Sequence, residues 1–317
     1  MNTEIKLQQT ENNFEIIGKL MDITYISPND SGEIRVTKAG NRYVSGNFII
    51  DTNWKAGAEE DPNHTSNEVR ISFFYQEKKK DGTPNPMFNE GLNYKEKFKT
   101  VLASADNPAE ASVIRVSGNS TRIAENVWFT PDGEQVNNYQ MSAMFFSEVR
   151  DRQNKNTFTV EGDVLQVINK DIGDDEASKE IAEVTLATIG YNGSVEALTF
   201  VVEDEAAVDY ISENFEQGNR VKLEGEIVNA VLRKIVEEEV AFGPPIQKVE
   251  TKFENKLLVK SSTIPVDSPV DPEVMKVKLE ERAGRIENLK EQNRQRNQAP
   301  TAAKSTASAT ESVWNIY

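Results

Sequence analysis

One short pattern occurs twice in this chain and constrains its fold more than any other feature. Residues 14–20 read Phe-Glu-Ile-Ile-Gly-Lys-Leu, and residues 158–164 repeat the arrangement with Gly162 in the place of Gly18. A second pattern likewise links residues 114–118 to residues 221–225. Apolar residues alternate in each copy, as in a half-buried strand, and an in-register glycine marks a bend or a close backbone approach. Strands that bend at glycine are typical of small coiled barrels, so we expect two barrels in tandem.

The composition excludes most kinds of catalytic and metal site. The chain has 317 residues, enough for two domains and a tail, with no cysteine and one histidine, His64, in a polar stretch. Disulfides, thiolate metal sites, imidazole clusters and most catalytic triads are therefore excluded, and His64 is expected in an exposed loop. The sequence also lacks a phosphate-binding Gly-Lys-Ser/Thr loop. We expect no enzyme, no cofactor and no metal site.

Neither a leader nor a membrane span is expected. Residues 1–6 contain no apolar core of the kind that a signal peptide needs, and no apolar run approaches the length of a spanning helix. The sequence therefore predicts a soluble cytoplasmic protein.

The negative charge is concentrated in the middle of the chain. The formal net charge is −16 overall, made up of −5 over residues 1–152, −13 over 153–250 and +2 over 251–317. Because binding depends on the local field, nucleic acid binding remains compatible with this sequence through the first domain or the tail.

The expected elements follow one order in both halves. The first half has predicted strands over residues 14–26, 34–38, 42–50 and 69–75, a helix over 94–105, a strand from 113 and a hairpin over 127–146. The second half has strands over 158–168, 183–189, 196–202 and 220–231, with a helix that carries Val208, Ile211 and Phe215. This is the order of the five-stranded oligonucleotide/oligosaccharide-binding (OB) barrel.

The predicted fold class is mainly β, with two tandem OB-like barrels, short helices and a helical and disordered C-terminal tail. Residues 248–260 either form an extra strand or complete the second barrel. The expected divisions are a flexible N-terminus at 1–13, barrels at 14–152 and 153–248, a strand and helix at 249–297, and a tail at 298–317.

The tail combines a helix with a terminal apolar peptide. Asp271 and Pro272 suit a helix start, and apolar residues recur at steps close to those of a coiled coil, although Arg282 interrupts them. This helix is either solvated or paired with a partner or another subunit. After a disordered stretch, the exposed side chains expected to dock onto a protein are Trp314, Ile316 and Tyr317.

One segment carries a family resemblance. Residues 215–227, Phe-Glu-Gln-Gly-Asn-Arg-Val-Lys-Leu-Glu-Gly-Glu-Ile, resemble the helix end and fourth strand of bacterial and phage single-stranded DNA-binding proteins. The resemblance implies an OB fold, single-stranded DNA as a partner, and a terminal peptide that recruits replication and recombination proteins. It also implies a location in the bacterial host cytoplasm if a phage encodes the chain. Two features depart from that family: the terminal peptide has Glu311 as its single acidic residue, and the best-matching barrel is the acidic one.

The first barrel holds the candidate binding residues. Single-strand binding needs cations along the phosphates and aromatic faces for the bases, which OB barrels present on strands 2–3 and the flanking loops. Phe73 and Tyr75 share a face with Val69 and Ile71 and are predicted core, whereas Phe74 points the opposite way. The candidates are Arg35, Lys38, Arg42, Tyr43, Trp54, Arg70, Phe74, Lys78, Lys79, Lys80, Phe88, Arg122 and Trp128.

These residues lead to one hypothesis and one alternative. The first is a non-enzymatic protein that coats single-stranded DNA without strong sequence preference during replication, recombination or repair, either as a monomer or as a homo-oligomer. The alternative is a scaffold, such as a virion or replisome component, that uses its barrels for protein contacts. Exposure of Trp54, Phe74 and Trp128 on one basic face favours the first, and their burial favours the second. The acidic second barrel is expected to repel DNA or to dock proteins.

Overall fold

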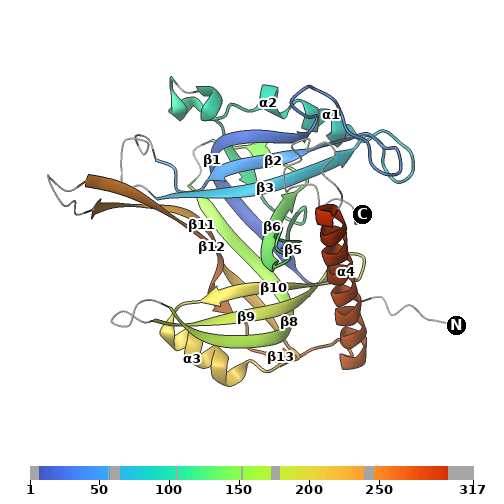
Figure 1. Cartoon of the computed structure of the whole chain (residues 1–317), viewed down its shortest axis with the longest axis vertical. Helices are drawn as coiled ribbons and strands as arrows, with labels where there is room; N and C mark the ends of the chain where they lie inside the picture. The colour runs from blue at the N-terminus through green and yellow to red at the C-terminus, as the bar shows by residue number, and fades with distance from the viewer. Residues whose placement is uncertain are drawn as a thin grey trace.

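The strands of the described part of the chain form one continuous hydrogen-bonded sheet, which coils into two barrels stacked one above the other (Figure 1). The computed structural model describes residues 7–55, 57, 65–104, 106–150, 153–172, 179–238 and 246–298, with side chains also left undescribed at 231–238, 246–252 and 298. The mainly β fold class predicted from alternation is confirmed.

The first barrel follows the OB circuit. Its strands pair antiparallel from β1 to β2 to β3, β4 returns to β1, and β6 runs parallel to β3 where Met141 lies opposite Ile71. The strands are β1 (Asn12–Ser27), β2 (Tyr43–Asp51), β3 (Ser66–Gln76), β4 (Val113–Val116), β5 (Thr121–Phe129), β6 (Gln135–Ala143) and the short β7 (Ser147–Glu148). Parallel pairing of the third strand with the last closes the barrel.

The helical segment between β3 and β4 differs from its prediction. Instead of one helix over residues 94–105, it contains α1 (Pro86–Leu92), α2 (Tyr94–Lys97) and two 3₁₀ turns, η1 (Leu102–Ser104) and η2 (Pro108–Glu110). Asn85 caps α1 by accepting a hydrogen bond from the Met87 amide, with Pro86 in the first turn. The chain becomes extended at Phe98, whose ring lies 5.8 Å from that of Phe48 in the core. Aromatic packing therefore overrides helical spacing here.

The second barrel repeats the circuit with a longer final hairpin. It contains β8 (Lys155–Ile172), β9 (Lys179–Ile189), β10 (Val195–Val202), α3 (Glu205–Asn214), β11 (Asn219–Glu238), β12 (Ile246–Ser262) and β13 (Val266–Asp267). β12 pairs antiparallel with β11 and parallel with β10, where Leu258 lies opposite Val201. Of the two interpretations of residues 248–260, completion of the second barrel is therefore the one that the structure shows.

Three of the four motif glycines occur where two backbones come too close for a side chain. A Cβ on Gly18 would lie 2.4 Å from the Asp51 carbonyl oxygen, one on Gly162 2.7 Å from that of Ala187, and one on Gly225 2.0 Å from that of Leu258. The fourth, Gly118, has open space around it and a φ of +87°, so it serves the turn before β5.

Antiparallel pairing of β1 with β8 joins the barrels. Phe14 lies opposite Phe158, and these residues hold the same place in the repeated pattern. A strand that meets its own counterpart in this way is related to it by a twofold axis. Asn12 and Asn156, a second matched pair, both donate side-chain hydrogen bonds to backbone carbonyls, at 2.7 Å and 3.1 Å. The chain is thus an internal pseudo-dimer.

Each barrel sends an arm onto the other. The first arm is the β5–β6 hairpin, where Arg122 forms a 2.7 Å ion pair with Glu196 of β10. The second arm is the part of the β11–β12 hairpin that extends past its own barrel, residues 228–238 and 246–256, which projects beside β3 (Figure 1). Its Ala230 pairs with Asn67 of β3, and the Asn67 amide donates to the Ile227 carbonyl at 3.0 Å. Reciprocal arms fix the orientation of the barrels.

The C-terminal helix α4 (Pro272–Gln298) packs on its own chain (Figure 1). Met275 and Leu279 pack against Ile189 and Val195 of the second barrel. Arg282 donates two hydrogen bonds to the Glu125 carboxylate of the first arm, one of them 2.8 Å long. The structure adds a contact that the sequence did not predict, because Arg282, which interrupts the apolar spacing, has its partner within the chain.

Replacing Gly225 by alanine is expected to destabilise the protein by about 1–3 kcal/mol, because the new methyl group overlaps backbone rather than a mobile side chain. Urea denaturation measures the change. Gly284→Ala is the control, since nothing lies within 4 Å of that position in α4, and alanine is expected to add up to about 1 kcal/mol of stability there. Equal unfolding midpoints for G225A and the wild type would contradict the close approach.

Arg282→Ala is expected to lower the free energy of unfolding by about 1–3 kcal/mol, because it leaves the Glu125 carboxylate, whose side chain is 10% exposed, without its guanidinium. Arg296→Ala, at an exposed position of the last turn of α4, is the control and is expected to stay within about 0.5 kcal/mol of the wild type. Denaturant unfolding monitored by circular dichroism compares the two. An equal effect of both substitutions would show that the Arg282–Glu125 pair does not hold α4.

Candidate nucleic-acid interface

The outward side of β2 and β3 forms the candidate surface, called here the β2–β3 face. Val44, Phe48 and Ile50 of β2 are fully buried inside the barrel, so the alternate residues point outward. On β3 the same alternation buries Phe73 and Tyr75, as predicted. The outward residues that carry rings or charge are Tyr43 and the buried Asp51 of β2, and Glu68, Arg70 and Phe74 of β3.

Two aromatic rings lie together at one end of this face. Tyr43 and Phe74 are both half-buried, with centroids 5.0 Å apart and planes 34° apart. Arg70, four residues before Phe74 on the same side of β3, is exposed, and no described residue forms an ion pair with it. A ring pair with an exposed cation along the strand is an arrangement that can accept bases and phosphates.

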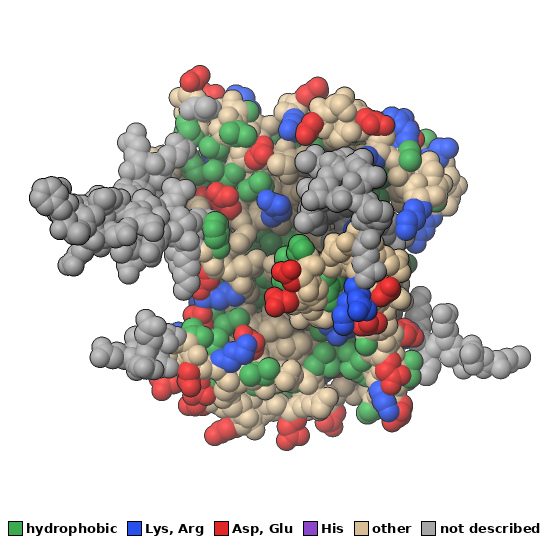
Figure 2. Space-filling view, viewed as in Figure 1, with side chains coloured by type: hydrophobic (Ala, Val, Ile, Leu, Met, Phe, Trp, Pro, Cys, Tyr) green, Lys and Arg blue, Asp and Glu red, His purple; other side chains and the backbone are tan. Residues whose placement is uncertain are grey.

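Two basic loops flank the ring pair. The loop before β2 carries Arg35, Lys38 and Arg42, and the loop after β3 carries the exposed residues 78–80. A hydrogen bond from the Glu77 amide to the Arg42 carbonyl, 2.9 Å long, holds the loops together. In Figure 2 the Lys and Arg side chains gather over these loops, at the upper right of the molecule. Arg42 itself pairs with the Glu77 carboxylate at 2.9 Å, so part of its charge is neutralised.

Two of the predicted site residues are corrected by their packing. Phe88 is 4% exposed and belongs to the hydrophobic core, because the capped start of α1 turns it inward beneath Arg42. Its predicted stacking role is wrong. Arg122 is 26% exposed at its side chain and pairs with Glu196 of the other barrel, so it stabilises the first arm instead of facing DNA.

The tryptophans lie apart from the ring pair. β2 ends at Asp51, about 26 Å along the strand from Tyr43 at 3.3 Å per residue, and Trp54 follows beyond that end. The Trp54 ring lies under the Lys19 ammonium at 4.8 Å. Burial lowers the pKa of Lys19. Trp128 is 39% exposed on the first arm. The structure therefore does not place Trp54, Phe74 and Trp128 together on one basic face, which was the arrangement that would favour DNA binding over a scaffold.

The second barrel carries an ion pair where the first has rings. Counting along the paired strands from the matched glycines, Lys179 takes the place of Tyr43 and Glu203 that of Phe74. Their ammonium and carboxylate groups lie 3.7 Å apart. A base has no aromatic plane to stack on at this point.

The remainder of that second face is also unsuited to a polyanion. Thr199 replaces Arg70 and shares a 3.0 Å hydroxyl–hydroxyl hydrogen bond with Thr185 of β9. At the far end, Ala187 and Ile189 are buried beneath Leu7 and α4. The acidity of this domain thus coincides with the loss of cations and rings from its strands 2–3.

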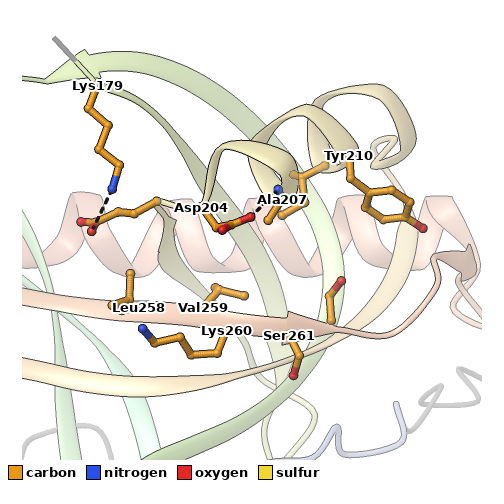
Figure 3. A pocket seen from close by; sticks show the side chains of 11 residues that line it. Lys179, Asp204, Ala207, Tyr210, Leu258, Val259, Lys260 and Ser261 are labelled. Atoms are coloured by element: carbon orange, nitrogen blue, oxygen red, sulfur yellow. Dashed lines mark hydrogen bonds and ion pairs between the residues drawn. The ribbon is translucent and has the colours of Figure 1, made fainter.

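A cavity of about 380 Å³ lies beside the Lys179–Glu203 pair, between α3 and β12 (Figure 3). Its charged groups are already matched inside the protein. Lys179 pairs with Glu203, and the Asp204 carboxylate accepts the Ala207 amide at the start of α3, at 3.0 Å (Figure 3). The cavity is therefore a poor receptor for phosphate.

Phe253 is an exposed aromatic residue that was not among the candidates expected from the sequence. Phe253 of β12 is 75% exposed on the second arm. It shares its side of the strand with the buried Leu257, so alternation alone predicts a core residue. A signal was present in the length of the hairpin, because strands longer than a small barrel requires must project beyond it.

Some predictions fall outside the described residues. They concern the docking peptide Trp314, Ile316 and Tyr317 and the loop residue His64. Within the described ranges, no three His, Cys, Asp or Glu side chains gather into a metal-binding group. None of the helices described combines the length and apolarity needed to cross a membrane.

A family model described as YorF matches residues 11–292, which include both barrels and most of α4. The chain belongs to the YorF family. No curated protein sequence matches it. The YorF match spans the two arms and the β1–β8 junction as well as the barrels.

Solved structures with a similar arrangement include single-stranded DNA-binding proteins. The wild-type protein from Thermus aquaticus is 13% identical, with a TM-score of 0.45 over 83% of this chain and 97% of that one. A deletion mutant of it is 14% identical, with a TM-score of 0.44 over 84% and 100%. The Plasmodium falciparum protein in complex with single-stranded DNA is 20% identical, with a TM-score of 0.23 over 37% and 100%. All three TM-scores lie below 0.5, so these likenesses carry no inference about function.

Proposed function

We propose that this protein binds single-stranded DNA without strong sequence preference, through the β2–β3 face of its first barrel. The observation that carries the proposal is the Tyr43–Phe74 ring pair, which lies between two basic loops on the outward side of strands 2 and 3. In OB barrels this is the side that takes single strands. Bases stack on aromatic planes regardless of their identity, which gives affinity without sequence readout.

The cations of this face supply the electrostatic part of binding. Arg70 lies along β3, and the exposed side chains of Lys38 and residues 78–80 border the ring pair. Arg35 and Arg42 complete the loop before β2. These cations track phosphates locally although the chain as a whole is acidic, because the field at about 10 Å is set by nearby charges.

The role that follows is non-enzymatic protection of single-stranded DNA in replication, recombination or repair, in a cytoplasmic setting. Trp128, exposed on the first arm, is a further candidate for base contact. The C-terminal residues Trp314, Ile316 and Tyr317 are proposed to recruit protein partners, since bulky apolar side chains at a polar terminus suit docking.

A scaffold remains the second candidate function, and one observation favours it. The second barrel has an ion pair and threonines where a nucleic-acid face would carry rings and cations. The second barrel is therefore better suited to contact a protein than to bind DNA. The first barrel keeps its rings and cations at the corresponding positions.

Titration with oligo-dT at several salt concentrations tests the proposal. Fluorescence anisotropy of labelled DNA is expected to show binding that weakens with salt, with a log–log slope of about −0.7 per phosphate contacted. Phe74→Leu is expected to weaken binding by about 1–3 kcal/mol, because leucine retains apolar volume but lacks a plane for stacking.

Phe74→Tyr is the matched control and is expected to keep near-wild-type affinity, since the ring remains. Tyr191→Leu, in the exposed β9–β10 turn, controls for loss of a surface ring elsewhere. If the wild type does not bind at about 50 mM salt, where attraction to phosphate is strong, the DNA-binding proposal fails and the scaffold takes its place.

A further inference from the structure

Phe253 is exposed in a setting where a ring is usually buried. It lies within the regular part of β12, yet 75% of its surface faces solvent. Asn255, two residues after Phe253 on the same side of β12, is also exposed. Leu257, two residues further, lies in the core of the second barrel with 1% of its surface exposed. The side of the strand that fills the second barrel therefore continues into the open on the second arm.

On the arm, this side becomes part of the first barrel's candidate surface. Phe253 lies opposite Val231 of β11, and Val231 lies opposite Ser66 of β3. Cross-strand partners project on the same side of a sheet, and alternate residues of one strand do likewise. Ser66 shares its side of β3 with Arg70 and Phe74, so Phe253 lies on the same side as both.

The spacing suits one continuous path. Phe253 is two strands from β3 and four residues along from Arg70, which places them about 16 Å apart at 3.3 Å per residue and 4.8 Å per strand. In Figure 1 the second arm lies beside the start of β3, at the end of the strand opposite to the one that leads into the basic loops. The ring pair and Arg70 thus lie on the same side of the sheet as Phe253, and the Glu68 carboxylate lies on that side of β3 between Arg70 and Ser66.

We propose that the two barrels build a single composite path for single-stranded DNA, in which the strand crosses the β2–β3 face and stacks a base on Phe253 of the second arm. The second barrel contributes this arm and not its own β9–β10 face, where Lys179 and Glu203 replace the ring pair. One chain therefore holds one strand, although it contains two OB barrels. The inference rests on the proposed function.

Phe253→Leu tests the path in the full chain. With oligo-dT of about 16 nucleotides, the upper site size of one OB barrel, affinity is expected to fall roughly 5- to 150-fold, the factor for one lost stacked base. With about 5 nucleotides, enough for the ring pair alone, no change is expected. Tyr191→Leu, which removes an 80% exposed ring from the β9–β10 turn of the same barrel, is the matched control and is expected to bind both oligomers as the wild type does.

A Phe253→Trp variant gives a second readout. If a base stacks on residue 253, the longer oligomer is expected to quench more tryptophan fluorescence in Phe253→Trp than in the wild type. In a Tyr191→Trp variant no additional quenching is expected. Stoichiometric titration is expected to give one strand per chain. Wild-type affinity of F253L for the longer oligomer, with F74L still impaired, overturns the composite path and leaves the proposed function standing. Failure of the wild type to bind either oligomer overturns both.

Discussion

The antiparallel pairing of β1 with β8 is the interaction on which the rest of the molecule depends. These strands meet about the matched pair Phe14 and Phe158, which makes the chain a dimer folded from one polypeptide. An exposed strand edge on each barrel would invite association with other chains, and mutual pairing covers both edges. The same pairing fixes the twofold relation that brings each arm onto the other barrel.

Contacts made by the two arms hold the barrels in a fixed arrangement about this junction. The first arm is held by the Arg122–Glu196 pair and by Arg282 of α4, and the second arm is hydrogen-bonded to β3 through Asn67. An ion pair that is largely buried favours one geometry, because leaving either charged group buried without its partner costs free energy. The second arm is held beside the β2–β3 face through hydrogen bonds between Asn67 and the backbone of Ile227 and Asn229, which a continuous binding path requires.

Near-symmetric barrels have acquired unequal surfaces. Tyr43 and Phe74 in the first correspond to Lys179 and Glu203 in the second, and Arg70 corresponds to Thr199. These replacements leave the barrel framework intact because all of them are on the outward side of the strands. The uneven charge of the chain, −13 over residues 153–250, follows from a fold that uses its two copies differently.

The sequence by itself determined the two barrels, the strands, the core positions of Phe73 and Tyr75 and the glycines at close backbone approaches. Alternation and glycine placement are local, and burial acts on them directly. Tertiary structure alone decided which exposed residues meet. Phe88 is buried by the turn into α1, Arg122 and Arg282 find carboxylates far away in the chain, and Phe253 reaches the other barrel's surface. Such contacts depend on strand register and on the joining of the barrels, which bring together residues separated by 70 or more positions, and no local pattern encodes that proximity.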